Sequence, residues 1–147
     1  MTPNPGDAEI REALCRSRTI AVVGISHRPD RPSHEVAAYL KGAGYRIIPV
    51  NPTLAGKEML GEHCVGSLSE IGGRVDIVDV FRRAEGVPEV IEDALQIDAP
   101  WIWLQLGIIH ETAAERARAA GRRVVQDLCI KIEHGRLRVP RPASPPP

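Results

Sequence analysis

The chain has 147 residues, and its 19 lysine and arginine residues balance its 19 aspartate and glutamate residues, so that the formal net charge at pH 7 is zero. This length is typical of one domain with its own hydrophobic core, and the neutral balance gives no electrostatic reason to expect nucleic acid or a membrane surface as a partner.

The apolar stretches are shorter than the roughly 20 residues of a membrane span. The first residues show neither the basic start nor the apolar centre of a signal peptide. The three cysteines form no CxxC pair, which is typical of reduced thiols. We therefore expect a cytoplasmic protein.

A first helix is predicted after Asp7, a residue able to cap it, because Ile10, Ala13 and Leu14 recur at helical spacing. We expect this helix to pack at the edge of a sheet.

Residues 19–33 organise the rest of the chain. The apolar run at residues 20–23 shows no alternation, which predicts a strand buried on both faces, as in a parallel sheet. Gly24 then permits a tight turn and a close approach of a ligand. Ser33 is expected to N-cap the helix that follows.

This strand, turn and helix predict a site for a phosphorylated ligand. The unpaired N–H groups in the first turn of a helix carry partial positive charge that suits an anion. Arg28 and Arg31 lie in the turn, where their guanidinium groups can add charge-assisted hydrogen bonds.

Helices and strands alternate along the remaining chain. Further strands are expected at residues 46–50, 75–81, 101–106 and 123–126. Helices are expected from residue 33 to a left-handed cap at Gly44, after the capping box Ser67–Glu70, at 88–95 and at 111–120. Residues 129–139 are interpreted as a last turn or hairpin. We expect one domain over residues 1–139 and a disordered, proline-rich tail over 140–147.

Five strands alternating with helices predict an α/β fold: a Rossmann-like, doubly wound parallel sheet in three layers, with strand order 3-2-1-4-5. The ligand of such a sheet lies outside the carboxyl ends of the strands, where the strand order reverses. Glycine, polar and basic residues follow those ends in this chain.

The sequence favours neither a dinucleotide ligand nor the binding and hydrolysis of ATP. The turn reads GISHRP and not GxGxxG, and Asn51 follows the second strand, where an NAD-binding domain places an acidic residue. No Walker-type loop follows the first strand. NAD is therefore less favoured without being ruled out.

Four spaced motifs then indicate a family. They are VVGISHRPDRPSHEVAAYLKGAGYRIIPVNP, LGEHCVGSLSEI, VDIVDVFRR and WLQLGI. In this order they resemble the small stand-alone bacterial coenzyme A-binding proteins, which are related to the coenzyme A-binding domain of the succinyl-coenzyme A synthetase alpha subunit. The resemblance covers residues 19–134 and implies a Rossmann-like domain that binds coenzyme A, or acyl-coenzyme A, across the strand ends.

The resemblance also implies a set of binding residues. Those for the diphosphate are Gly24, Ile25, Ser26 and Ser33, with Arg28 and Arg31 close to phosphate charge. Those for the rest of the ligand are Asn51 and Pro52 on the nucleotide side, Phe81, Arg82 and Arg83 in the third loop, and Gln105 and Gly107 on the pantetheine side.

Catalysis and metal binding are not expected. The family's last motif has an arginine between its aspartate and cysteine, and here Asp127-Leu128-Cys129 has leucine. The domain that supplies the synthetase's phosphorylated histidine has no counterpart in this chain, so ligase activity is not expected. Two alternatives stay open: an enzyme acting on an acyl thioester or nucleotide through His27, His110 or Cys129, and an NAD(P)-responsive regulatory module. A protein partner or a homodimer also stays open.

Overall fold

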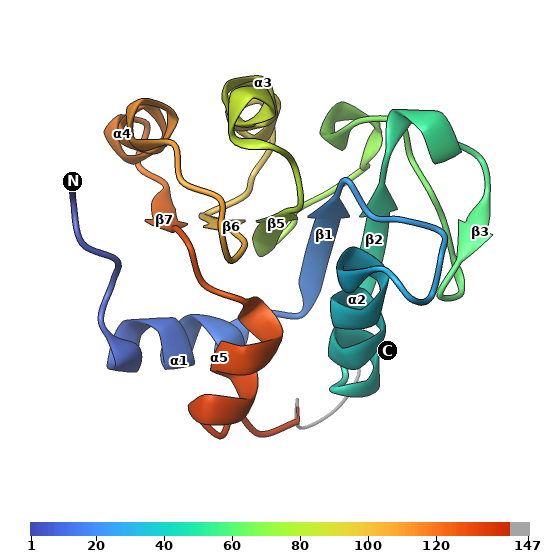
Figure 1. The fold of residues 1–147 in the computed structure, drawn as a ribbon, viewed down its shortest axis with the longest axis horizontal. Helices are drawn as coiled ribbons and strands as arrows, with labels where there is room; N and C mark the ends of the chain where they lie inside the picture. The colour runs from blue at the N-terminus through green and yellow to red at the C-terminus, as the bar shows by residue number, and fades with distance from the viewer. Residues whose placement is uncertain (142–147) are drawn as a thin grey trace.

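The computed structural model describes residues 1–141 and shows the three-layer α/β fold predicted from the sequence (Figure 1). The central parallel sheet has five strands. They are β1 (Thr19–Val23), β2 (Arg46–Val50), β5 (Ile77–Val80), β6 (Trp101–Leu104) and β7 (Arg123–Val125). One face carries α1 (Asp7–Arg16), α2 (Pro32–Gly42) and α5 (Ile130–Arg136), and the other carries α3 (Val87–Ala94) and α4 (Glu111–Ala119). The predicted tail lies outside the described residues from residue 142 onward.

The predicted strand order is wrong. The sheet runs β2-β1-β5-β6-β7, so the second strand is an edge strand and the third lies beside the first. Pro49 explains this, because a proline in β2 has no N–H to donate to a second neighbouring strand. Among residues 1–141, the pairing beyond β2 is a bridge of Val50 to Val65, in which the Pro49 carbonyl accepts the N–H of Val65 at 3.0 Å. The order now reverses between β1 and β5, so the expected ligand position beside β1 is retained.

Short elements connect β2 to β5. They are the 3-10 turn η1 (Pro52–Leu54), the hairpin of β3 (Glu58–Met59) with β4 (Glu62–His63), and the 3-10 turn η2 (Leu68–Glu70). The predicted capping box is present at η2, where the Ser67 N–H donates to Glu70 Oε2 at 2.8 Å. A third 3-10 turn, η3 (Ala84–Gly86), leads into α3.

The first helix begins and packs differently from the prediction. Its N-cap residue is Gly6, and Asp7 is already helical and pairs with Arg136 at 2.7 Å. Ile10 and Leu14 belong to the same buried cluster as Trp103 of the central sheet. The helix therefore covers a face of the sheet and does not lie at its edge, because only a sheet face offers enough apolar surface to bury these side chains.

The segment after Cys129 forms a helix and not a hairpin. Ile130, Glu133 and His134 are its buried residues, at helical spacing. Glu133 and His134 are polar, so the apolar pattern that marks a helix in the sequence is interrupted. Within the described residues, none of the helices combines the length and the apolar character needed to cross a bilayer.

Candidate functional site

A groove of about 550 Å³ lies at the carboxyl edge of the sheet, beside the ends of β1 and β5. The residues that line it come from the loop after β1, the first turn of α2, the segment after β5 and the loop after β6. They are Gly24, Ser26, Arg28, Arg31, Pro32, Ser33, Phe81, Arg82, Arg83 and Ile108. Eight of these ten residues are among those the sequence predicts. Because the strand order reverses here, the groove occupies the position in which doubly wound sheets bind ligands.

Gly24 is required by the geometry of the groove floor. Its backbone φ is 87°, in the left-handed region that favours glycine. A Cβ at this position would overlap the carbonyl oxygen of Phe81. Glycine therefore allows β1 to end against β5 and leaves the floor of the groove open.

The loop after β1 is held by two residues in the first turn of α2. The Ser33 hydroxyl accepts the Ser26 N–H at 2.9 Å, and the His34 ring bonds the Ser26 carbonyl through Nδ1 at 3.0 Å. Ser33 is thus not the helix cap that the sequence predicts. The N-cap residue is Arg31, and Pro32 occupies the first helical position, which proline favours because it lacks the N–H that a helix start leaves unpaired.

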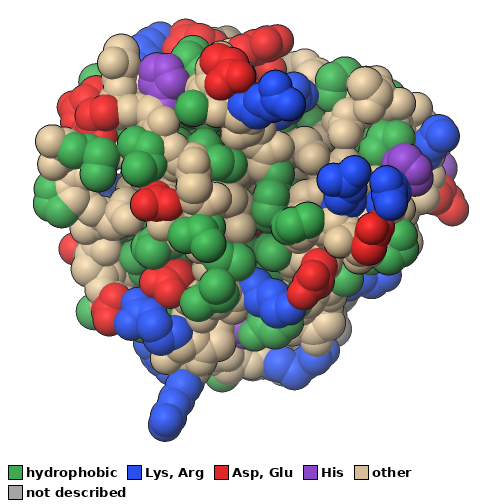
Figure 2. Space-filling model, in the orientation of Figure 1, with side chains coloured by type: hydrophobic (Ala, Val, Ile, Leu, Met, Phe, Trp, Pro, Cys, Tyr) green, Lys and Arg blue, Asp and Glu red, His purple; other side chains and the backbone are tan. Residues whose placement is uncertain are grey.

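Four arginines give the groove a local positive charge. Arg28 pairs with Asp30 at 3.2 Å, whereas Arg31, Arg82 and Arg83 form no ion pair within residues 1–141. The Nε of Arg82 is also buried without a hydrogen-bond partner in this part of the chain. On the face drawn in Figure 2, basic and acidic side chains are interspersed, and neither kind forms a broad patch of one sign.

Five predicted site residues do not line the groove. Ile25 is fully buried in the core below α2. Asn51 uses its side chain locally, since Nδ2 donates to the Ile25 carbonyl at 2.8 Å and Oδ1 accepts the Thr53 N–H at 3.0 Å. Gln105 is buried, and its Oε1 accepts the Ile130 N–H at 3.1 Å.

The other two predicted residues, Gly107 and Pro52, lie beside the groove: Gly107 is next to a lining residue, and Pro52 is in a neighbouring cavity. Gly107 has φ 84° and precedes the lining residue Ile108. Pro52 lines a second, smaller cavity of about 160 Å³. Arg82 lines both spaces, so the groove and the small cavity are neighbours.

Sequence analysis missed Pro32 and Ile108 as lining residues. Pro32 could have been found from the preference of proline for the first helical position. Ile108 follows the predicted residue Gly107 by one position, and an apolar residue in a loop gives no signal of its own.

The candidate reactive groups lie outside the lining of the groove. His110 N-caps α4, and its Nδ1 accepts the Ala113 N–H at 3.1 Å. Cys129 is the N-cap residue of α5. Neither they nor His27 are among the lining residues. Over residues 1–141 no three His, Cys, Asp or Glu side chains are grouped as metal ligands.

This arrangement defines a Rossmann-like ligand-binding domain. The family model described as a CoA binding domain matches residues 18–135, and the chain belongs to that family. It is 53% identical over 131 residues to the uncharacterized protein YneT of Bacillus subtilis, covering 89% of this chain and 96% of that protein.

Solved structures resemble the fold over most of its length. A structure from Thermus thermophilus, cell-free ID.343, is 41% identical with a TM-score of 0.88, covering 90% of this chain and 99% of that one. A dinucleotide-forming acetyl-coenzyme A synthetase 1 of Ca. Korarchaeum cryptofilum, in complex with phosphate and ADP, has a TM-score of 0.69 at 24% identity, covering 77% of this chain and 26% of that one. At that identity the likeness concerns the fold alone.

Proposed function

We propose that this protein binds coenzyme A, or an acyl-coenzyme A, in the groove at the carboxyl edge of the sheet and catalyses no reaction of its own. The observation that carries the proposal is that three guanidinium groups, which have no ion-pair partner among residues 1–141, meet the start of α2 and an apolar wall in one groove. The family of the chain supports the choice of ligand.

The chemistry of coenzyme A matches the two kinds of surface in the groove. Its diphosphate and 3′-phosphate carry negative charge that Arg31, Arg82 and Arg83 can neutralise. Phe81 and Ile108 offer apolar surface to the uncharged pantetheine arm. The start of α2 adds N–H groups aimed at an anion.

The small cavity suits the adenine ring. Its apolar lining includes Val23, Val50 and Leu68, and its acidic residues are Glu89 and Asp93. Carboxylates repel phosphate but can accept hydrogen bonds from an exocyclic amine. We therefore assign the nucleotide end of the ligand to this cavity and the phosphates to the groove, with Arg82 between them.

Arg82 is the strongest single candidate for a phosphate contact. A buried donor without a partner costs about 1–3 kcal/mol, and a ligand oxygen at Nε would remove that cost. This gain is available only when an anion is bound, so Arg82 contributes to affinity more than to folding.

The absence of catalysis is proposed because no group able to act as a nucleophile or base, within the described residues, lines the groove near the arginines apart from hydroxyls. Ser26 and Ser33 are the hydroxyl residues. The Ser26 Oγ accepts the Arg28 N–H at 3.1 Å and the Ser33 Oγ accepts the Ser26 N–H, so neither is paired with a general base.

Isothermal titration of the folded protein with coenzyme A tests the proposal. We expect saturable binding, and a loss of at least about tenfold in affinity for Arg82→Met, which keeps the apolar stem but removes the charged donors. Arg16→Met is the matched control, because Arg16 lies on α1 with its side chain 81% exposed and paired to Glu12. The absence of binding by folded wild-type protein at millimolar coenzyme A would overturn the proposal.

Two further measurements distinguish this proposal from the alternatives, an NAD(P)-responsive regulatory module and an enzyme. A larger rise in melting temperature with NAD than with coenzyme A would favour the regulatory module, since a ligand that binds only the folded state raises that temperature. Release of free thiol from acetyl-coenzyme A above the rate in buffer, and its loss in His27→Ala, His110→Ala or Cys129→Ala, would favour the enzyme.

A further inference from the structure

The loop between β6 and α4, which carries the groove residue Ile108, is anchored on both sides of that residue. The Gly107 N–H donates to Asp127 Oδ1 at 2.7 Å. The His110 N–H donates to Gln126 Oε1 at 2.8 Å. Two consecutive residues after β7 therefore hold the backbone immediately before Ile108 and two residues after it.

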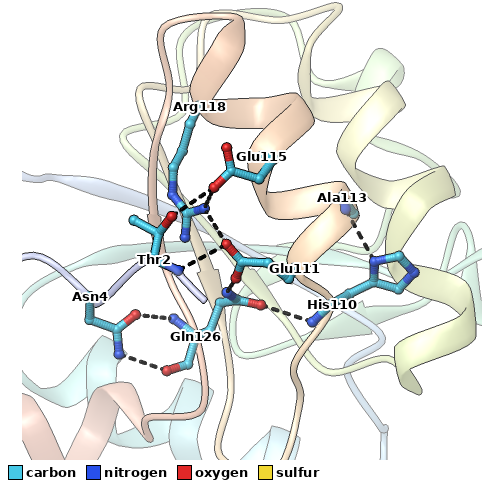
Figure 3. Close-up of polar contacts among 8 residues, drawn as sticks. All are labelled: Thr2, Asn4, His110, Glu111, Ala113, Glu115, Arg118 and Gln126. Atoms are coloured by element: carbon cyan, nitrogen blue, oxygen red, sulfur yellow. Dashed lines mark hydrogen bonds and ion pairs between the residues drawn. The ribbon is translucent and has the colours of Figure 1, made fainter.

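Gln126 is itself fixed at every polar atom. Its side chain also donates from Nε2 to Glu111 Oε2 at 2.9 Å. Its backbone is paired by the Asn4 side chain, which donates from Nδ2 to the Gln126 carbonyl and accepts the Gln126 N–H at Oδ1, both at 2.8 Å. The N-terminal segment thus binds the residue that holds the loop (Figure 3).

Glu111 completes this network from α4. Its carboxylate accepts the Thr2 N–H at 3.2 Å and pairs with Arg118 at 2.9 Å. Burial by itself would raise the pKa of Glu111, but the bonds from Thr2, Arg118 and Gln126 lower it to about 2. The carboxylate therefore stays charged at neutral pH and keeps the Gln126 amide oriented, with Oε1 toward His110.

Asp127, whose side chain accepts the Gly107 N–H, has a backbone conformation that glycine adopts more easily. Its φ is 60°, in the left-handed region. Aspartate tolerates this region better than most residues, at a cost that glycine avoids. A glycine at position 127 would have no side-chain acceptor for the Gly107 N–H, which the Asp127 carboxylate supplies.

We propose that Gln126 and Asp127 are positioning residues that set the ligand affinity of the groove by fixing Ile108 in its wall. This inference rests on the proposed function, in that the ligand tested is coenzyme A. Neither residue lines the groove, so neither acts by direct contact with the ligand. Removing the negative charge of Asp127 would by itself strengthen the binding of an anion, so a weaker binding would have to come from the loop.

Amide exchange in the ligand-free protein, measured by NMR, tests the anchoring directly. In Asp127→Gly the left-handed backbone is relaxed and the acceptor is lost, so we expect the Gly107 N–H to exchange at least about tenfold faster. Asp127→Asn keeps an oxygen acceptor and should exchange like the wild type. Equal exchange at Gly107 in the wild type and Asp127→Gly would overturn the inference.

A double-mutant cycle tests the effect on affinity. We expect Asp127→Gly and Ile108→Ala each to weaken coenzyme A binding by about three- to tenfold, and the double variant to bind no more weakly than Ile108→Ala alone. Additive losses, or unchanged affinity in Asp127→Gly, would show that the loop does not transmit the effect. A general loss of stability would not produce this non-additivity or the rescue by Asp127→Asn.

The two proposals fail in different ways. Absence of coenzyme A binding by the wild type would overturn the proposed function and the effect on affinity with it. Two exchange rates in the ligand-free protein, that of the Gly107 N–H in Asp127→Gly and that of the His110 N–H in Gln126→Ala, would still decide whether Asp127 and Gln126 hold the loop.

Discussion

The Ser33 hydroxyl oxygen accepts a hydrogen bond from the backbone N–H of Ser26 at 2.9 Å, across the turn that forms the floor of the groove. Ser33 is only 7% exposed, so water cannot readily replace this acceptor. We expect Ser33→Ala to lower the free energy of unfolding by about 1 kcal/mol and to weaken coenzyme A binding, because the turn loses the contact that fixes its shape. Urea denaturation and isothermal titration measure the two effects.

Thr112→Ala serves as the control for Ser33→Ala, because it also removes a hydroxyl group, and Thr112 is exposed on α4 and lies outside the groove. It should leave the affinity unchanged and should not lower the free energy of unfolding. Unchanged affinity in Ser33→Ala would show that the turn keeps its shape without this hydrogen bond.

Gly24→Ala separates backbone strain from steric overlap when it is compared with Gly121→Ala. The two glycines have nearly equal φ, 87° and 85°. A Cβ at Gly121 meets nothing within 4 Å, whereas one at Gly24 overlaps the Phe81 carbonyl. Gly121→Ala should therefore cost about 1–2 kcal/mol from the left-handed backbone, and Gly24→Ala clearly more.

Urea denaturation of both glycine variants measures the difference. Equal losses of stability would mean that β1 and β5 can move apart at no cost. We also expect Gly24→Ala, and not Gly121→Ala, to abolish coenzyme A binding.

Local patterns in the sequence predict the elements of this fold well. The bounds of β2, the end of β1 and the starts of β6 and β7 agree with the prediction, because a strand buried on both faces needs apolar residues at consecutive positions. Most residues of the groove are also predictable, since Gly24, Arg82 and their neighbours directly follow predicted strands.

Relationships between distant segments were harder to predict. The strand order depends on which strand can lie at an edge, and Pro49 was the one local signal for it. Asn51 and Gln105 have side chains suited to a ligand, yet the structure uses them to hold the Ile25 carbonyl and the Ile130 N–H. A polar side chain near a site does not reveal in the sequence whether the protein or a ligand satisfies it.

Asp76 and Asp79 illustrate the same limit, because both interrupt the apolar run around β5 and their surroundings are opposite. Burial would raise the pKa of Asp76, but the N–H groups of Arg18 and Thr19 and the Arg74 guanidinium lower it below 3.8. The Arg18 N–H lies 2.7 Å from Oδ2. The charged form thus contributes stability above pH 3.8, which is lost as the pH falls through the lowered folded-state pKa.

We therefore expect Asp76→Asn to cost about 1–2 kcal/mol of unfolding free energy at pH 7. The difference in unfolding free energy between Asp76→Asn and the wild type should shrink as the pH falls below 3.8, the ordinary pKa of this carboxyl in the unfolded chain. Urea denaturation between pH 7 and pH 3 measures it, and a difference that stays constant over this range would contradict the assigned role of the charge.

Asp79 is fully buried in β5, between Val22 of β1 and Trp103 of β6. Neither of its carboxylate oxygens has a hydrogen-bond partner within residues 1–141. Desolvation by burial raises its pKa well above 3.8, because the charged form is unstable in apolar surroundings. The folded state then keeps the proton at pH values where the unfolded chain releases it.

The sign of the pH dependence is opposite to that of Asp76. The contribution of Asp79 to stability is full below about pH 3.8 and declines, by up to about 1.4 kcal/mol for each pH unit, as the pH rises toward the raised folded-state pKa. Asp79→Asn replaces the acid with a neutral group of similar shape and removes this decline. We expect the variant to gain stability relative to the wild type as the pH rises from the unfolded-state pKa toward the raised folded-state pKa of Asp79, measured by urea denaturation. Asp98→Asn removes a carboxylate that is exposed and paired with Arg74 only at 3.6 Å. Because an exposed ion pair contributes little to stability, this variant should closely follow the wild-type curve. Parallel curves for Asp79→Asn and the wild type would mean that the buried carboxyl already ionises at low pH.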